Sequence, residues 1–207
     1  KVLYVLNKIN LDKKNLFIDL GTNKGQGFNY FKKFFKLDKF DYLLIEPNPN
    51  LKSNIEELIK KNNSKNKIYF INKAAHIENS KTKLFGTVED DRGKMSEGAS
   101  IINEHNSNMY KSNYEKGLWV ETFDIIQKIK NLKKYDNIII KMDIEGAEYE
   151  ILEKLILHKN EINNVKHMFI EFHSRFMNKT NKNKYKAREK KIKEKLVKLN
   201  LNFTTWI

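Results

Sequence analysis

Cysteine is absent from the 207 residues, which excludes disulfides and thiolate metal sites and fits a reducing compartment. No run of about 18 apolar residues exists, so no segment is predicted to cross a bilayer. The first residues lack the basic, apolar and small-residue order of a secretory signal. We therefore expect one cytoplasmic domain over residues 1–207. Within it we expect an extension over residues 1–15, a core over residues 16–175, and a basic helix and strand over residues 182–207.

Arginine is scarce, because only three of the 40 basic residues are Arg although the formal net charge is +14. A charge of this size suggests a nucleic-acid partner. Lysine, however, is a point charge without the forked geometry that suits phosphate and guanine. Because Lys, Asn and Ile are abundant in every segment, we interpret the charge as a compositional bias of the whole chain. Nucleic acid is therefore the less favoured partner.

Apolar runs and helical periodicity alternate along the chain, which predicts an α/β fold with a mostly parallel sheet and helices on both faces. Residues 88–117 are polar and lack periodicity, which is typical of a functional or disordered connection. The predicted strands cover residues 16–20, 42–45, 68–71, 138–140, 168–172 and 203–207. The predicted helices cover residues 27–35, 51–61, 123–129, 147–158 and 182–199.

The first predicted strand leads into a glycine-rich loop in residues 17–28, FIDLGTNKGQGF. A strand, a glycine turn and a helix in this order are typical of a site for a nucleotide-like ligand. The glycines at Gly21, Gly25 and Gly27 do not follow the Gly-x-Gly-x-x-Gly spacing that brings a helix onto a dinucleotide pyrophosphate. A loop that is open at this point suits a ligand without phosphates, such as S-adenosylmethionine.

Polar residues also follow the other predicted strands, where ligands of open parallel sheets bind. Glu46 lies 27 residues after Asp19, and its carboxylate can accept two hydrogen bonds from a ribose diol. The alternative is a solvated acid before a turn. The amino-acid end of S-adenosylmethionine would meet Asp19 and the loop amides. Two further polar clusters are residues 143–148 and the pair Glu171 and His173.

Six segments resemble, in the same order, the motifs of the FkbM-like methyltransferases. They are DLGTNKG (19–25), EPNP (46–49), AA (74–75), TFD (122–124), KMDIEGAE (141–148) and EFH (171–173), and KMDIEGAE is the most specific. The resemblance implies a Rossmann-like class I methyltransferase fold over about residues 16–175. It also implies S-adenosylmethionine as the cofactor and a hydroxyl of a sugar, glycan or natural product as the acceptor.

The resemblance implies that the cofactor is held by the glycine loop and the acid after the second strand, with its adenine near Ala75. The residues that we expect to bind it are Asp19, Gly21, Thr22, Asn23, Gly25, Glu46, Ala75 and Asp143.

Methyl transfer from a sulfonium is an in-line displacement, so alignment supplies much of the acceleration, and the acceptor hydroxyl must lose its proton. Asp143 ends the fourth predicted strand. Glu171 and His173 are two residues apart in the fifth, so their side chains would project to one face. We hypothesise that Asp143 and His173 flank the acceptor, with His173 as the base and Glu171 orienting it. A divalent ion held by Asp143 and Glu171 is a variant that we do not expect.

Two other functions stay open. In the first, the acceptor is an RNA ribose 2′-hydroxyl, activated by Lys141 and Asp143 with another lysine and a glutamate, and the basic helix follows the backbone. The few Arg residues and the absence of a recognisable base-stacking surface argue against it. In the second, the chain is a non-catalytic binding module; the glycine loop and Glu46 argue against that. The preferred partner is a small-molecule or carbohydrate acceptor, and the oligomeric state is left open.

Overall fold

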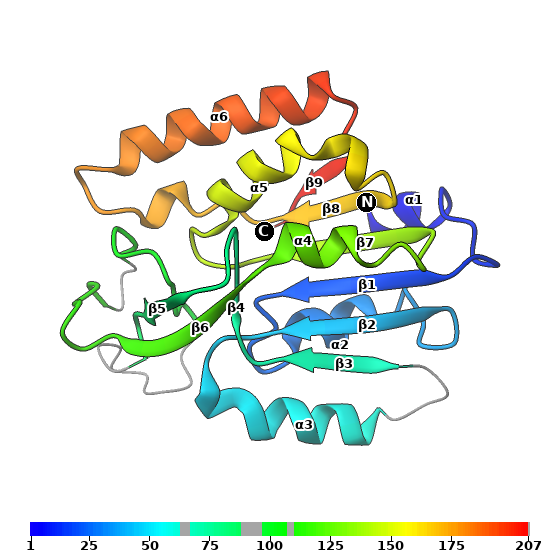
Figure 1. Ribbon diagram of the computed structural model, residues 1–207, viewed down its shortest axis with the longest axis horizontal. Helices are drawn as coiled ribbons and strands as arrows, with labels where there is room; N and C mark the ends of the chain where they lie inside the picture. Colours follow the sequence, from blue (N-terminus) through cyan, green and yellow to red (C-terminus); the bar gives the residue numbers. More distant parts are fainter. Residues whose placement is uncertain (63–66, 88–96, 107–109, 207) are drawn as a thin grey trace.

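The computed structural model describes residues 1–62, 67–87, 97–106 and 110–206. Six strands of this part form one sheet in the order β3-β2-β1-β7-β8-β9 (Figure 1). Their bounds are β1 Asn15–Leu20, β2 Phe40–Ile45, β3 Ile68–Ile71, β7 Asn137–Met142, β8 Val165–Ile170 and β9 Phe203–Thr205. Every neighbouring pair is parallel. The chain reverses its direction across the sheet between β1 and β7, so this α/β, Rossmann-like sheet has its binding crevice there.

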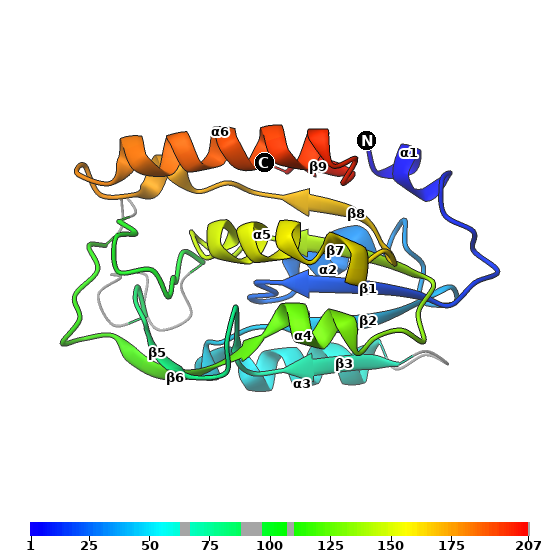
Figure 2. The same ribbon diagram turned by 45° about the horizontal axis from the view of Figure 1, so that its top comes forward.

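Alternate residues of the central strand β1 face opposite sides of the sheet. Leu16 and Ile18 belong to a buried cluster with α4 (Ile125–Lys130), α5 (Glu148–Leu157) and α6 (Lys182–Lys198). Phe17 belongs to a second cluster with α1 (Val2–Leu6), α2 (Gln26–Phe31) and α3 (Lys52–Lys61). Figures 1 and 2 show α5 and α6 side by side, with α2 on the other face. Helices therefore cover both faces, as predicted.

The second cluster is rich in aromatic rings. The ring centroid of Phe17 lies 4.9 Å from that of Phe31 and 5.3 Å from that of Phe35. Such pairs add about 0.5–1.5 kcal/mol each beyond the burial of their area. The predicted helix over residues 27–35 is too long, because α2 ends at Phe31 and Phe35 reaches the core from the turns that follow.

A second sheet has the order β4-β6-β5, with β4 Ala74–His76, β5 Lys81–Leu84 and β6 Leu118–Asp124. It lies beyond the carboxyl ends of β1 and β2 (Figure 1). None of these three strands is among the predicted ones; β4 and β5 are short, and β5 is lysine-rich. The predicted helix over residues 123–129 begins two residues too early, because β6 continues to Asp124. The Asp124 carboxylate then caps α4 by accepting from the backbone N–H of Gln127.

The predicted fifth strand is displaced, because β8 ends at Ile170. Glu171 and His173 therefore lie in the segment after the strand and before the 3₁₀ helix Ser174–Phe176. Because they are not part of a strand, the prediction that strand alternation places their side chains on one face was wrong. Further 3₁₀ helices cover Pro49–Leu51 and Lys159–Glu161.

The two ends of the chain pack onto the domain. In the expected extension, Val2 and Val5 of α1 are buried in the aromatic cluster. At the other end, α6 buries Ile192 and Leu196, as its predicted apolar stripe requires. Across the described ranges, every helix is too short or too polar to span a membrane. The predicted irregular segment over residues 88–117 lies partly outside the described residues.

Candidate active site

A cavity of about 480 Å³ opens at the carboxyl ends of the central strands, which is within the usual size range of ligand sites. It is bounded by the loop after β1, the end of β2, β4, and the segments after β7 and β8. Seven of the predicted site residues line it: Gly21, Thr22, Asn23, Glu46, Ala75, Asp143 and Glu171. In the described part of the chain, Asp19, Gly25 and His173 are not among the lining residues.

Gly21 allows the loop after β1 to approach β7 closely. Its φ is +76°, and a Cβ there would lie 1.8 Å from the backbone oxygen of Asp143, so a larger residue would collide with the chain. The N–H groups of Gly21 and Thr22 both donate to the Ile45 carbonyl at 3.0 Å. The loop thus joins the ends of β1, β2 and β7. These two amides, which we expected at the amino-acid end of the cofactor, are already engaged within the protein.

Glu46 presents a rigidly held carboxylate at the end of β2. Its Oε2 accepts from the Asn23 N–H and its Oε1 from the Asn48 N–H, both at 2.9 Å. Burial raises the pKa of Glu46 to about 7, although the two N–H donors oppose the change. Each carboxylate oxygen keeps a further lone pair for a ligand. The fixed acid in the cavity wall can therefore accept hydrogen bonds from the hydroxyl groups of a ligand such as a ribose.

Asp19 lies beneath the cavity rather than in its wall. It shares the α2 face of β1 with Phe17, and a Cβ on Gly27 would come within 3.2 Å of both its carboxylate oxygens. Its carboxylate pairs with Lys141, whose Nζ is 3.1 Å from Oδ1. Asp19 and Lys141 are also aligned with each other in the register between β1 and β7. Burial raises the pKa of Asp19 against the opposing effect of Lys141.

Lys141 lines the cavity, whereas we expected Asp19 to do so at the amino-acid end of the cofactor. Its Nζ donates to the Gly21 carbonyl at 2.7 Å and lies 3.5 Å from Asp143 Oδ2. Burial lowers the pKa of Lys141, but Asp19 and Asp143 outweigh it and raise the pKa overall. The preferred function made no use of this ammonium group. The sequence feature that could have identified Lys141 is its position two residues before Asp143, on the strand that pairs with β1.

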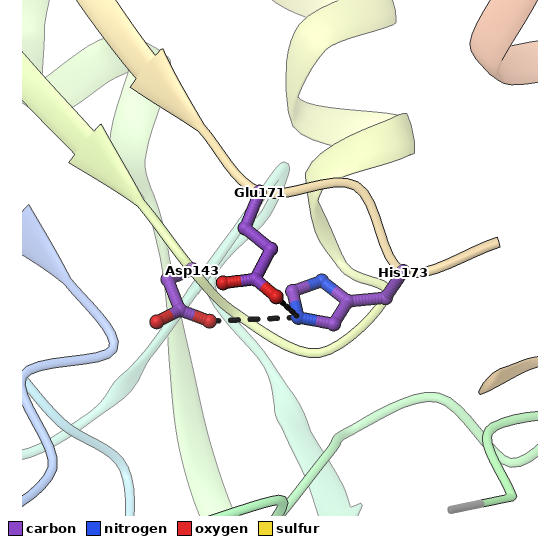
Figure 3. A group of neighbouring side chains, drawn as sticks. All are labelled: Asp143, Glu171 and His173. Atoms are coloured by element: carbon purple, nitrogen blue, oxygen red, sulfur yellow. Dashed lines mark ion pairs between the residues drawn. The ribbon is translucent and has the colours of Figure 1, made fainter. Parts of the chain in front are cut away.

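Asp143, Glu171 and His173 come together as predicted (Figure 3). His173 Nε2 lies 3.5 Å from Asp143 Oδ1 and 3.7 Å from Glu171 Oε1, and both carboxylates approach this nitrogen. Burial raises the pKa of Asp143, but Lys141 and His173 outweigh it and lower the pKa to about 2. Asp143 and Glu171 line the cavity, whereas His173 is 1% exposed and lies behind them.

Glu148 holds His173 from the other side of the ring. Its Oε1 lies 3.3 Å from Nδ1 and accepts from the His173 backbone N–H at 2.8 Å, while Oε2 accepts from the Gly146 N–H. Burial lowers the pKa of His173, but Glu148 and Asp143 outweigh it and raise the pKa well above its ordinary value. The imidazole is therefore favoured in its protonated form, which argues against the free base that we expected. We did not predict the role of Glu148.

The sequence profile of the methyltransferase FkbM domain matches residues 19–195. The chain therefore belongs to the FkbM methyltransferase family, which confirms the resemblance inferred from its motifs.

Similarity to other proteins is otherwise distant. A crystal structure of methyltransferase FkbM from Methylobacillus flagellatus KT is similar to this chain, with 16% sequence identity and a TM-score of 0.44. The similarity covers 71% of this chain and 31% of the other chain. The present chain thus spans about a third of the length of that protein. None of the curated proteins compared with the chain is significantly similar to it.

Proposed function

We propose that this chain transfers a methyl group from S-adenosylmethionine to a hydroxyl of a sugar, glycan or small natural product. The observation that carries the proposal is Glu46, whose carboxylate is fixed by the Asn23 and Asn48 N–H groups in the wall of the cavity. Membership of the FkbM methyltransferase family supports methyl transfer as the reaction.

The residues around the cavity suit the separate parts of this cofactor. Glu46 would accept hydrogen bonds from the ribose hydroxyls, and Ala75 of β4 would border the adenine. Lys141, held beside Asp143, would attract the cofactor carboxylate, while Asp143 would attract the ammonium group. When bound, the cofactor supplies a methyl group activated by a sulfonium. Gly21 keeps the loop close to β7, so that these groups surround one space.

The acceptor would enter from the side of Asp143 and Glu171, the two catalytic carboxylates that line the cavity. Asp143 or Glu171 would accept the proton of the acceptor hydroxyl and release it to solvent, and the cofactor would supply the methyl group and keep the electron pair of its carbon–sulfur bond. His173 acts from behind as a positioning residue, since its Nε2 lies within 4 Å of both acids. We thus assign the protein-side proton acceptor to the carboxylates rather than to the imidazole.

A transfer assay tests the proposal. The full chain is incubated with S-adenosylmethionine labelled in its methyl group, together with a carbohydrate and natural-product panel or with capped RNA. Label in a hydroxyl of the first panel, reduced in Asp143→Asn, supports the proposal. Label in RNA instead would show a ribose 2′-O-methyltransferase. Cofactor binding by calorimetry without any transfer to either panel would indicate a binding module.

A further inference from the structure

We propose that Asp143, Glu171 and His173 bind a divalent transition-metal cation at the acceptor side of the cavity. One potential ligand atom of each residue lies within 4.8 Å of the other two. The three side chains come from the ends of two adjacent strands and from the segment that follows, and they converge on one point (Figure 3). This departs from the expectation that an ion is not needed here.

The spacing of the ligand atoms suits a metal better than it suits hydrogen bonds. His173 Nε2 lies 3.5 Å from Asp143 Oδ1 and 3.7 Å from Glu171 Oε1, at or beyond the limit of a good hydrogen bond. Ligands at 2.0–2.4 Å around one cation are separated by about 3–3.5 Å. The distances from Nε2 to the two carboxylates are thus close to those between the ligands of one cation.

Glu148 prepares the imidazole for this role. Its Oε1 lies 3.3 Å from His173 Nδ1 and is itself fixed by the His173 backbone N–H. With the Nδ1 proton directed at Glu148, Nε2 faces the carboxylates of Asp143 and Glu171, and a cation bound there would take the place of the Nε2 proton. Glu171 Oε1 also accepts a hydrogen bond from the Arg175 guanidinium, so an ion would share this oxygen with Arg175. A carboxylate on the far nitrogen of a ligating histidine is the usual support of metal sites.

A second imidazole lies close to that of His173, with the two ring centroids 6.4 Å apart. His105 is fully buried, and its Nδ1 contacts the Tyr110 hydroxyl, which donates to the Gly98 carbonyl. Its Nε2 makes no hydrogen bond to any described residue, yet it lies 3.0 Å from Glu145 Oε2. That same oxygen is 3.5 Å from His173 Nε2. Glu145, which lines the cavity, is therefore available as a further ligand.

The donor set indicates the class of metal. One imidazole with two or three carboxylates combines a borderline nitrogen with hard oxygens, which suits Mn²⁺, Fe²⁺ or Zn²⁺ better than Mg²⁺. The side of the site that faces the cavity leaves positions for an acceptor. If the proposed function is right, the ion would polarise the acceptor hydroxyl and ease loss of its proton. The metal site itself does not depend on that function.

Mn²⁺ binding to the full chain, after removal of metals with a chelator, tests the proposal. Binding is measured as the loss of the signal of free Mn²⁺ in electron paramagnetic resonance spectra. We expect one Mn²⁺ per wild-type chain and binding at least tenfold weaker in Asp143→Asn and Glu171→Gln. Glu148→Gln is expected to weaken binding by about 10–100-fold through the imidazole. His158→Gln is the matched control, because that imidazole also pairs with a glutamate, Glu161, but lies outside the cavity. It is expected to bind like the wild type.

The metal site would be overturned if the wild type does not bind Mn²⁺. It would also be overturned if Asp143→Asn and Glu171→Gln bind Mn²⁺ with the affinity of the wild type. Glu171→Gln is the decisive variant, because this side chain lies in the cavity wall and its amide has nearly the same shape. Circular dichroism of each variant checks the fold. Calorimetry with S-adenosylmethionine on the stripped chain separates the two proposals. Cofactor binding without Mn²⁺ binding would remove only the metal site, and the reverse would remove only the proposed function.

Discussion

Lys141 and Asp19 lie directly opposite each other on β7 and β1, with the Nζ of one 3.1 Å from the Oδ1 of the other and both side chains buried. The lysine also donates to the Gly21 carbonyl, so the ion pair holds the glycine loop against the sheet. Asp19 thus lies beneath the site and stabilises the loop through Lys141, whereas the charged end of Lys141 borders the cavity.

The first prediction concerns this pair. Lys141→Met leaves Asp19 buried without its partner, and we expect it to lower the free energy of unfolding by about 3–5 kcal/mol. The double variant Asp19→Asn/Lys141→Met removes both charges and is expected to recover much of that loss. Urea unfolding of the two single variants, the double variant and the wild type forms the cycle. Strictly additive effects would show that the two groups do not interact.

The second prediction is a pH dependence at Glu46. Its folded-state pKa of about 7 lies above the ordinary value of 4.5, so between these pH values the folded chain holds a proton that the unfolded chain has lost. Its contribution to stability is therefore complete below about pH 4.5 and decreases as the pH rises to about 7. The loss amounts to roughly 3 kcal/mol.

Glu46→Gln removes this titration. The free energy of unfolding of the variant, relative to the wild type, is expected to increase by roughly 3 kcal/mol between about pH 4.5 and pH 7, so the variant becomes relatively more stable. Chemical denaturation at several pH values measures the difference. Asp12→Asn, an exposed substitution, is the control and should not change the slope. Parallel curves for Glu46→Gln and the wild type would refute a raised pKa.

The third prediction concerns the loop glycines. Gly21→Ala places a Cβ 1.8 Å from a backbone oxygen at a positive φ, whereas Gly27→Ala places one 3.2 Å from the Asp19 side chain. We expect Gly21→Ala to lower the free energy of unfolding by at least about 2 kcal/mol and Gly27→Ala by less. Thermal unfolding of both variants compares them. Equal melting temperatures would mean that the loop can move away from Asp143 without cost.

The fourth prediction concerns Asp143 in the proposed transfer reaction. Asp143→Asn keeps the shape of the side chain but removes the charge beside Lys141 and His173. We expect kcat to fall by about 10²–10⁴-fold and the Kd of S-adenosylmethionine to rise by a smaller factor, because Asp143 would also attract the ammonium group of the cofactor. Glu121→Gln, which changes an exposed side chain of β6, is the control for general effects of charge. A normal kcat in Asp143→Asn would remove this residue from the chemistry.

The framework of the fold was predictable because β1, β2 and β7 are short and mainly apolar, and because Gly21 follows β1, Glu46 follows β2 and Asp143 follows β7. Ile138, Ile139 and Ile140, for example, are all fully buried between helices on both faces. The short strands β4 and β5 were not predictable, since they are formed by pairing with β6 rather than by a pattern of their own. The end of β8 was displaced because the apolar run continues to Phe172, past the last residue of the strand at Ile170.

At the site, sequence reasoning found the right residue types at the strand ends but not their directions. Glu46 and Asp143 line the cavity as expected, whereas Asp19 points to the α2 face. That direction follows from the alternation with Phe17, once the face of Phe17 is known. Glu148 supports His173 from the start of α5, a contact between residues 25 apart that no local pattern encodes.

Calorimetric titration of the full chain with S-adenosylmethionine at about pH 8, where Glu46 is ionised, is the most direct test of the proposed cofactor site. We expect one molecule to bind per chain and Glu46→Gln to weaken the affinity by at least tenfold, while the exposed Asp12→Asn binds like the wild type. If the wild type does not bind the compound, or if Glu46→Gln binds it equally well, the cavity at the ends of β1 and β2 is not its site.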